Sequence, residues 1–134
     1  MKKFDTYSKC LNVLLTADRK KAEGDELYRM GVIGQFNLTF ELACKAVKEL
    51  LEFHGILAEK IGSPREIFKA AYEVNFVNDE TILLDMLRRR NISVHLYDEE
   101  KAIELVNLIF DNYISALVNL KNSLAEKIPK TDDA

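Results

Sequence analysis

Apolar residues recur at every third or fourth position through most of the chain, which is typical of the buried face of an α-helix. An early series predicts a first helix from about residue 4 to residue 21, with Gly24 and Asp25 interrupting the chain after it. The longest series predicts a long helix packed in a bundle and ending near Gly55 or Gly62. The early series consists of Phe4, Tyr7, Leu11 and Leu14, and the longest of Ile33, Phe36, Phe40, Ala43, Val47, Leu50, His54 and Leu57.

Two further helix starts follow. Residues 63–66 combine a Ser that can cap a helix, a Pro at its first position and a Glu that can reach back, which predicts a short helix to about Val74. Asn78 or Asp79 can cap the next helix, which we expect to run through Arg90 and somewhat beyond.

The last helix is expected to begin at Asp98, because acidic residues fill the turn that follows it. Pro129 and a polar tail from about residue 127 end it. Turn-rich sheets need Gly and Pro every few residues, whereas this chain has only five Gly and two Pro. The fold class is therefore all-α, an antiparallel up-and-down helical bundle of four main helices plus one short helix. The buried positions expected in the last helix are Ala102, Val106, Ile109, Tyr113, Leu117, Leu120 and Leu124.

Composition adds limits on size and partners. The 134 residues, 48% of them hydrophobic, predict one domain over residues 1–134. A net charge of -3 gives no global attraction to nucleic acid or anionic lipid, so phosphate chemistry would need a local cluster of cations. No apolar run approaches the roughly 18 residues that span a bilayer, and the N-terminus does not resemble a signal peptide. We expect a cytoplasmic protein that does not bind a membrane.

Most signatures of enzymes and cofactor sites are absent from the sequence, including phosphate-binding glycine loops and paired-cysteine metal sites. Cys10 and Cys44 are far apart and are expected to be buried thiols. The two histidines, His54 and His95, do not make a metal site without distant carboxylates. We expect no metal and no cofactor, and a structural role for His54.

Cations, an amide, an imidazole and a phenol crowd into residues 88–98 of an otherwise acidic chain, which suits phosphate binding. Arg88 and Arg89 are explained by a solvated helix face on which Asp85 pairs with one of them. Arg90 and His95 would point about 140° apart on a continuous helix at roughly 100° per residue. Their cooperation therefore requires the helix to end, to bend or to pair with a second copy.

Arg90 and Asn91, followed by His95 and Tyr97, match the RNxxxHxY form of the RxxxxH motif of the HEPN superfamily. Together with residues 40–45 and 63–66, the motif resembles the branch called nucleotidyltransferase substrate-binding proteins, over roughly residues 4 to 124. The resemblance implies a helical bundle whose partner is a separate minimal nucleotidyltransferase.

That partner family carries a Gly-Ser followed by an Asp-x-Asp that binds magnesium. This chain has Gly62 and Ser63 but no Asp-x-Asp, so it lacks the metal site of nucleotidyl transfer. The resemblance implies the other half of a toxin–antitoxin-like pair, in which the HEPN subunit is a ribonuclease or binds RNA. In some such systems the nucleotidyltransferase adds AMP to the tyrosine of the motif. By position that tyrosine is Tyr97, which is otherwise a packing residue.

Metal-free RNA cleavage needs a base, an acid and a cation for the charge of the phosphorane. His95 can be the base or the acid, and Arg90 can bind phosphate through two hydrogen bonds. One motif supplies only part of these groups, so we expect a homodimer with a composite site. Asn91 either orients a phosphate or ribose or is a residue at the helix end.

Glu41 and Lys45 have the spacing of an ion pair that stabilises an exposed helix turn. Alternatively they line the groove that faces Arg90 and His95, where Lys45 adds a phosphate contact. Three functions stay open: a nucleotide- or substrate-binding subunit of the nucleotidyltransferase, which the resemblance favours; a toxin ribonuclease; and a scaffold. The sequence does not separate the first two.

Overall fold

The computed structural model describes residues 1–56, 62–93 and 98–129, and gives the backbone alone for residues 91–93. All regular elements in this part of the chain are helical, which confirms the all-α class. In chain order they are α1 (Lys2–Leu15), α2 (Arg19–Gly24), α3 (Glu26–Phe53), α4 (Pro64–Glu73), α5 (Glu80–Ser93), α6 (Glu99–Leu108), the π-helical segment η1 (Ile109–Tyr113) and α7 (Ile114–Ala125).

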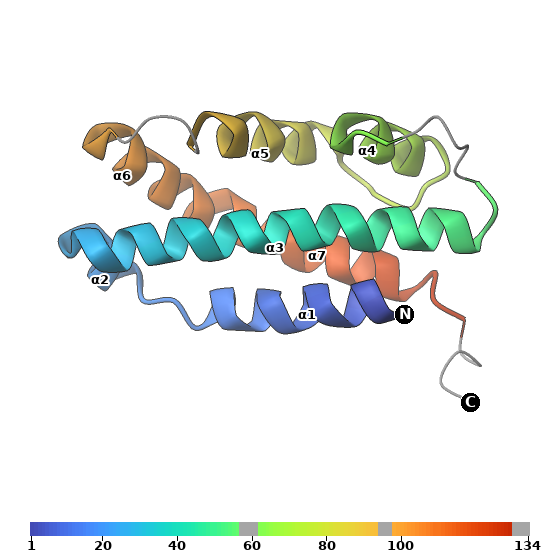
Figure 1. Ribbon diagram of the computed structural model, residues 1–134, viewed down its shortest axis with the longest axis horizontal. Helices are drawn as coiled ribbons and strands as arrows, with labels where there is room; N and C mark the ends of the chain where they lie inside the picture. Colours follow the sequence, from blue (N-terminus) through green and yellow to red (C-terminus); the bar gives the residue numbers. More distant parts are fainter. Residues whose placement is uncertain (57–61, 94–97, 130–134) are drawn as a thin grey trace.

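The helix α3 runs the length of the molecule, and the other elements pack around it (Figure 1). α1 lies along one side, and α4 and α5 follow one another along the opposite side. The run from α6 through η1 to α7 packs against α3 and, near its end, against α1. Successive long helices alternate in direction, so the chain is the antiparallel bundle that the apolar pattern predicts.

The first predicted helix is wrong in one respect, because the chain breaks at residues 16–18 and begins the short helix α2. Asp18 caps α2, with its Oδ1 accepting from the Lys21 amide at 3.2 Å. Asp25 then caps α3, with its Oδ1 accepting from the Tyr28 amide at 3.1 Å. The interruption at Gly24 and Asp25 is confirmed, and α3 begins as soon as α2 ends.

The later helix starts lie where the sequence predicts them. Ser63 and Glu66 form a reciprocal capping box, in which the Ser63 Oγ accepts from the Glu66 amide at 3.2 Å. The two hydrogen bonds from Ser63 hold the pKa of the Glu66 carboxyl below its usual value. Of the two candidate caps before α5, Asp79 is the one that caps the helix, with its Oδ1 accepting from the Thr81 amide at 3.0 Å. Asp98 caps α6, with its Oδ1 accepting from the backbone amides of Glu100 and Lys101 at 3.0 and 3.2 Å.

The end of α3 is a turn at Gly55, one of the two predicted stops, with a positive φ of 69° that favours glycine. His54 is the residue that follows the last helical turn, and its Nε2 lies 2.9 Å from the Lys127 carbonyl oxygen. Its ring also packs edge-on against Phe53 and Phe76. The structural role expected for His54 is confirmed, while Leu57 lies outside the described residues.

All seven positions expected to be buried in the last helix are buried. Ile109, Tyr113 and Leu117 follow one another at two consecutive steps of four, which exceeds the ordinary turn of 3.6 residues. The π-helical segment accommodates this spacing, since its hydrogen bonds span five residues. The helical run Glu99–Ala125 is long and apolar enough to cross a bilayer, which the apolar pattern did not predict. The core helix of a bundle can have the same length and apolar composition.

The centre of the bundle is aromatic. The ring of Phe36 stacks on that of Tyr113 with centroids 5.5 Å apart, and Phe40 contacts Phe68 at 5.7 Å. Cys10 and Cys44 are free and buried, as the sequence predicts. The core therefore joins α3 to α4 and to the π-helical segment.

Candidate functional site

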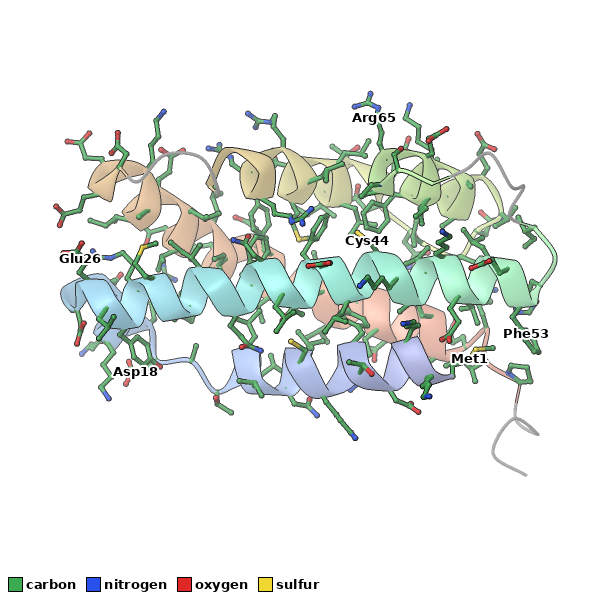
Figure 2. The ribbon with its side chains drawn as sticks, in the orientation of Figure 1. Met1, Asp18, Glu26, Cys44, Phe53 and Arg65 are labelled. Carbon is green, nitrogen blue, oxygen red and sulfur yellow. The ribbon has the colours of Figure 1, made fainter. Side chains whose placement is uncertain are left out.

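The candidate site comprises the last turn of α5 and the turn of α3 that carries Glu41, Cys44 and Lys45. Arg90 belongs to that last turn and is half-buried. Cys44 lies on the side of α3 that faces the layer of α4 and α5 (Figure 2). Burial raises the pKa of the Cys44 thiol to about 12, the positive charge of Arg90 opposes this rise, and the negative charge of Glu41 adds to it. The charges of Arg90, from α5, and of Glu41, from α3, therefore both act on the Cys44 thiol.

Glu41 and Lys45 form the ion pair that their spacing predicts, with the Lys45 Nζ 3.7 Å from the Glu41 Oε1. Their side chains are about half exposed, at 48% and 53%, so the pair contributes little to stability. The same turn of α3 carries Cys44, on which Arg90 acts. The ion pair on the helix turn is confirmed, and the lining of a groove that faces Arg90 and His95 by Glu41 and Lys45 stays a prediction.

The two arginines before Arg90 have structural partners. Arg88 donates to the Asp85 Oδ1 at 2.9 Å, which confirms the predicted pair on the surface of α5. Arg89 instead donates to the Glu104 Oε1 at 3.1 Å and so ties α5 to α6. These contacts assign Arg88 and Arg89 to the framework that surrounds Arg90.

A further contact next to the site was missed by the sequence analysis. The hydroxyl of Tyr113, in the π-helical segment, donates a short hydrogen bond to the Asp85 Oδ2. This bond is the main cause that lowers the pKa of the Asp85 carboxyl. Burial, followed by the hydrogen bond to Asp85, raises the pKa of the Tyr113 phenol, so the hydroxyl stays protonated and donates. The one signal in the sequence was the repeated step of four residues around Tyr113.

The remaining residues of the motif lie beyond what the structure describes in full. Asn91 lies in α5 by its backbone, and His95 and Tyr97 lie outside the described residues. The helix α5 ends at Ser93, between Arg90 and His95. The predicted end of the helix within the motif stays a prediction, because residues 94–97 lie outside the described residues. Among residues 1–56, 62–93 and 98–129, no three His, Cys, Asp or Glu side chains gather as metal ligands would.

Comparison with known proteins identifies the family of this chain. The sequence pattern of the family described as nucleotidyltransferase substrate binding protein like matches residues 2–126. The chain belongs to this family. The match covers all the helices of the bundle, and it confirms the resemblance to the HEPN-like proteins that rests on residues 40–45, 63–66 and the RNxxxHxY motif.

A curated relative carries a more specific name. The probable ribonuclease HepT of Haemophilus influenzae is 30% identical to this chain over 88 residues. The match covers 64% of this chain and 60% of the relative, so it spans less than two thirds of the length of that protein.

Proposed function

We propose that this chain is a metal-independent ribonuclease that acts as a homodimer and is paired with a separate nucleotidyltransferase. The observation that carries the proposal is the similarity to a probable ribonuclease HepT in a chain that also has the RNxxxHxY motif. From the sequence alone a nucleotide- or substrate-binding subunit came first and the ribonuclease second. The name of the relative reverses that order.

The proposed reaction uses groups of this chain alone. A histidine base takes the proton of a ribose 2′-hydroxyl, whose oxygen attacks the adjacent phosphorus. The bond from phosphorus to the 5′-oxygen breaks, and an acid returns a proton to that oxygen, so the products carry a 2′,3′-cyclic phosphate and a 5′-hydroxyl. Arg90 stabilises the negative charge on the phosphorane oxygens. His95 acts as base or acid, and the His95 of a second copy supplies the other role.

The charges around Arg90 support this assignment. Lys45 belongs to the same α3 turn as Cys44, on which the charge of Arg90 acts, and it would add a second positive charge to the site. Glu41 holds Lys45 at 3.7 Å and thereby limits where its ammonium group lies. Asn91 follows Arg90 directly in the sequence, and we assign its amide to bind phosphate or ribose.

One exposed face of α3 supports the homodimer. We call this face the α3 stripe; it comprises Leu27, Met30, Gly31, Gly34 and Leu38 and continues into Glu41 and Lys45. Leu27 is 84% exposed, and no described helix crosses the front of α3 in Figure 1. Contiguous exposed apolar residues mark interaction surfaces, and glycines allow two backbones to approach closely. A second copy bound at the α3 stripe would lie beside the candidate site.

Cleavage of single-stranded RNA in excess EDTA tests the proposed activity. We expect the wild-type chain to cut RNA and His95→Ala to lose the activity. Arg65→Ala serves as the matched control, because Arg65 is an exposed arginine of α4 (Figure 2). Equal cleavage by wild type and His95→Ala would refute the assignment of His95.

The family description supports a second candidate, a subunit that binds the substrate of the nucleotidyltransferase. Intact mass after incubation with that enzyme, ATP and magnesium tests the partnership. If the nucleotidyltransferase neutralises a ribonuclease, the mass of the chain increases by one or more AMP units, and Tyr97→Phe abolishes the gain. If neither form gains mass and the wild type does not cut RNA, the substrate-binding subunit is favoured.

A further inference from the structure

The turn of α5 before Arg90 is fastened to two other elements of the bundle. Asp85 accepts the hydroxyl hydrogen bond of Tyr113 and also the 2.9 Å hydrogen bond of Arg88. Arg89 contacts Glu104 of α6 at 3.1 Å, and its positive charge opposes the rise in the pKa of the Tyr113 phenol. Asp85 and Arg89 are four residues apart, so both project from the same side of α5. We call these four residues, Asp85, Arg89, Glu104 and Tyr113, the Tyr113 network.

The π-helical segment places Tyr113 for this contact. It runs over Ile109–Tyr113, inside an otherwise α-helical run from α6 to α7. A π turn rotates the residues on its two sides relative to one another, and such turns occur often at functional sites. The Tyr113 ring is fully buried and stacks on Phe36, so its hydroxyl has a fixed position beneath α5. The wide turn therefore presents a rigid donor to Asp85.

We infer that Tyr113 and Asp85 are positioning residues, which hold the last turn of α5 so that Arg90 points into the candidate site. Neither residue is assigned any contact with RNA. Arg90 follows Arg89 directly in α5, and His95 follows Arg90 by five positions in the sequence. A small displacement of that last turn would move Arg90 relative to Lys45 and to the RNA. This inference rests on the proposed ribonuclease function.

Two tyrosines of this chain provide a matched test. Tyr7 and Tyr113 are both fully buried, and each donates a hydroxyl hydrogen bond, Tyr7 to the Leu117 carbonyl oxygen of α7 and Tyr113 to Asp85. Tyr7→Phe and Tyr113→Phe thus remove the same atom from comparable surroundings, but only the second touches α5. We expect Tyr113→Phe to lower kcat for RNA cleavage by about ten- to a hundredfold with KM changed by less than about twofold. Tyr7→Phe should leave both constants within about twofold of wild type.

The carboxylate offers a second pair of variants. Asp85→Asn keeps an oxygen that can accept from Tyr113, whereas Asp85→Ala removes it. We expect Asp85→Asn to retain more of the wild-type kcat than Asp85→Ala. Because partial unfolding also lowers the apparent kcat at an unchanged KM, kcat is expressed per folded chain, with the folded fraction of each variant taken from its urea unfolding curve. Equal kcat values for Tyr113→Phe, Tyr7→Phe and wild type would overturn the inference.

Hydrogen exchange separates failure of this inference from failure of the proposed function. If the wild type does not cleave RNA, the proposed function fails, and amide exchange still tests the position of α5. We expect the amides of residues 86–93 to exchange faster in Tyr113→Phe than in Tyr7→Phe, with α4 unchanged in both. Exchange at residues 86–93 that is the same in the two variants would overturn the role of Tyr113 whether or not the chain is a ribonuclease.

Discussion

Replacing both Gly31 and Gly34 by alanine tests the use of the α3 stripe. Both glycines lie inside α3, and a Cβ atom added at either one meets nothing within 4 Å. Glycine in a helix interior is less favourable than alanine by roughly 0.8–1.0 kcal/mol, so the double variant should raise the free energy of unfolding of the single chain by about 2 kcal/mol. For a chain of this size, that corresponds to an increase in Tm of about 6–8 °C.

The same change should weaken the dimer. If a second copy packs its backbone against Gly31 and Gly34, two added methyl groups on each chain force the helices apart. We expect the dissociation constant of the dimer to increase by about tenfold or more, which is a free-energy change of roughly 1.4 kcal/mol. The variant is thus expected to be more stable as a single chain and less dimeric.

Urea unfolding at low protein concentration measures the stability of the single chain, and analytical ultracentrifugation measures the dimer. Gly62→Ala is the control, because Gly62 lies outside the α3 stripe and its added Cβ also meets nothing within 4 Å. It should leave the dissociation constant unchanged. A stabilised double variant with the dissociation constant of the wild type would refute the role of the α3 stripe, and a destabilised single chain would refute the helix argument.

Two further predictions concern the framework. Ser63→Ala removes the capping box of α4 and should lower the free energy of unfolding by about 1 kcal/mol; an unchanged urea midpoint would contradict this. Asp85→Asn tests the charge of Asp85, whose pKa in the folded chain is lowered from its ordinary 3.8, chiefly by the Tyr113 hydrogen bond. The stabilisation by ionised Asp85 is therefore present above about pH 3.8 and is lost as the pH falls through the lower folded pKa. The difference in Tm between wild type and Asp85→Asn should shrink over that range, and a difference that grows on acidification would be evidence against it.

The elements that the sequence predicts correctly depend on local chemistry. Three helix caps bind backbone amides within the next three residues, so the local sequence is enough to predict them. They are Ser63 with its partner Glu66, Asp79, and Asp98. The long apolar series of α3 also predicts the buried face of that helix correctly, because the spacing of its residues alone determines which face is buried.

The break before α2 depends instead on contacts between distant residues. Residues 16–18 contain no glycine or proline, and the one local signal for the break is the Asp18 cap on the Lys21 amide. The Asp18 amide donates to the Tyr28 hydroxyl at 2.8 Å. Arg29 is buried and donates to the carbonyl oxygens of Ala22 and Glu23 at 2.9 and 2.8 Å, which fastens α2 against α3. These contacts become visible only once the chain has folded.

The candidate site divides in the same way. The motif identifies Arg90 from sequence alone, and spacing identifies the pair of Glu41 and Lys45. The Tyr113 network was missed because Asp85 and Tyr113 are 28 positions apart and each already had a local explanation. Asp85 was assigned to a neighbouring arginine and Tyr113 to the core, and both assignments are correct but incomplete.

The most direct test of the central claim is the rate at which the purified chain cleaves a single-stranded RNA in EDTA, with the new ends identified. We expect the wild type to give 2′,3′-cyclic phosphate and 5′-hydroxyl ends, Arg90→Ala to lose cleavage by about a hundredfold or more, and Arg65→Ala prepared in the same way to cleave like the wild type. Cleavage that persists undiminished in Arg90→Ala, or no cleavage by the wild type with protein in excess over RNA, would contradict that claim.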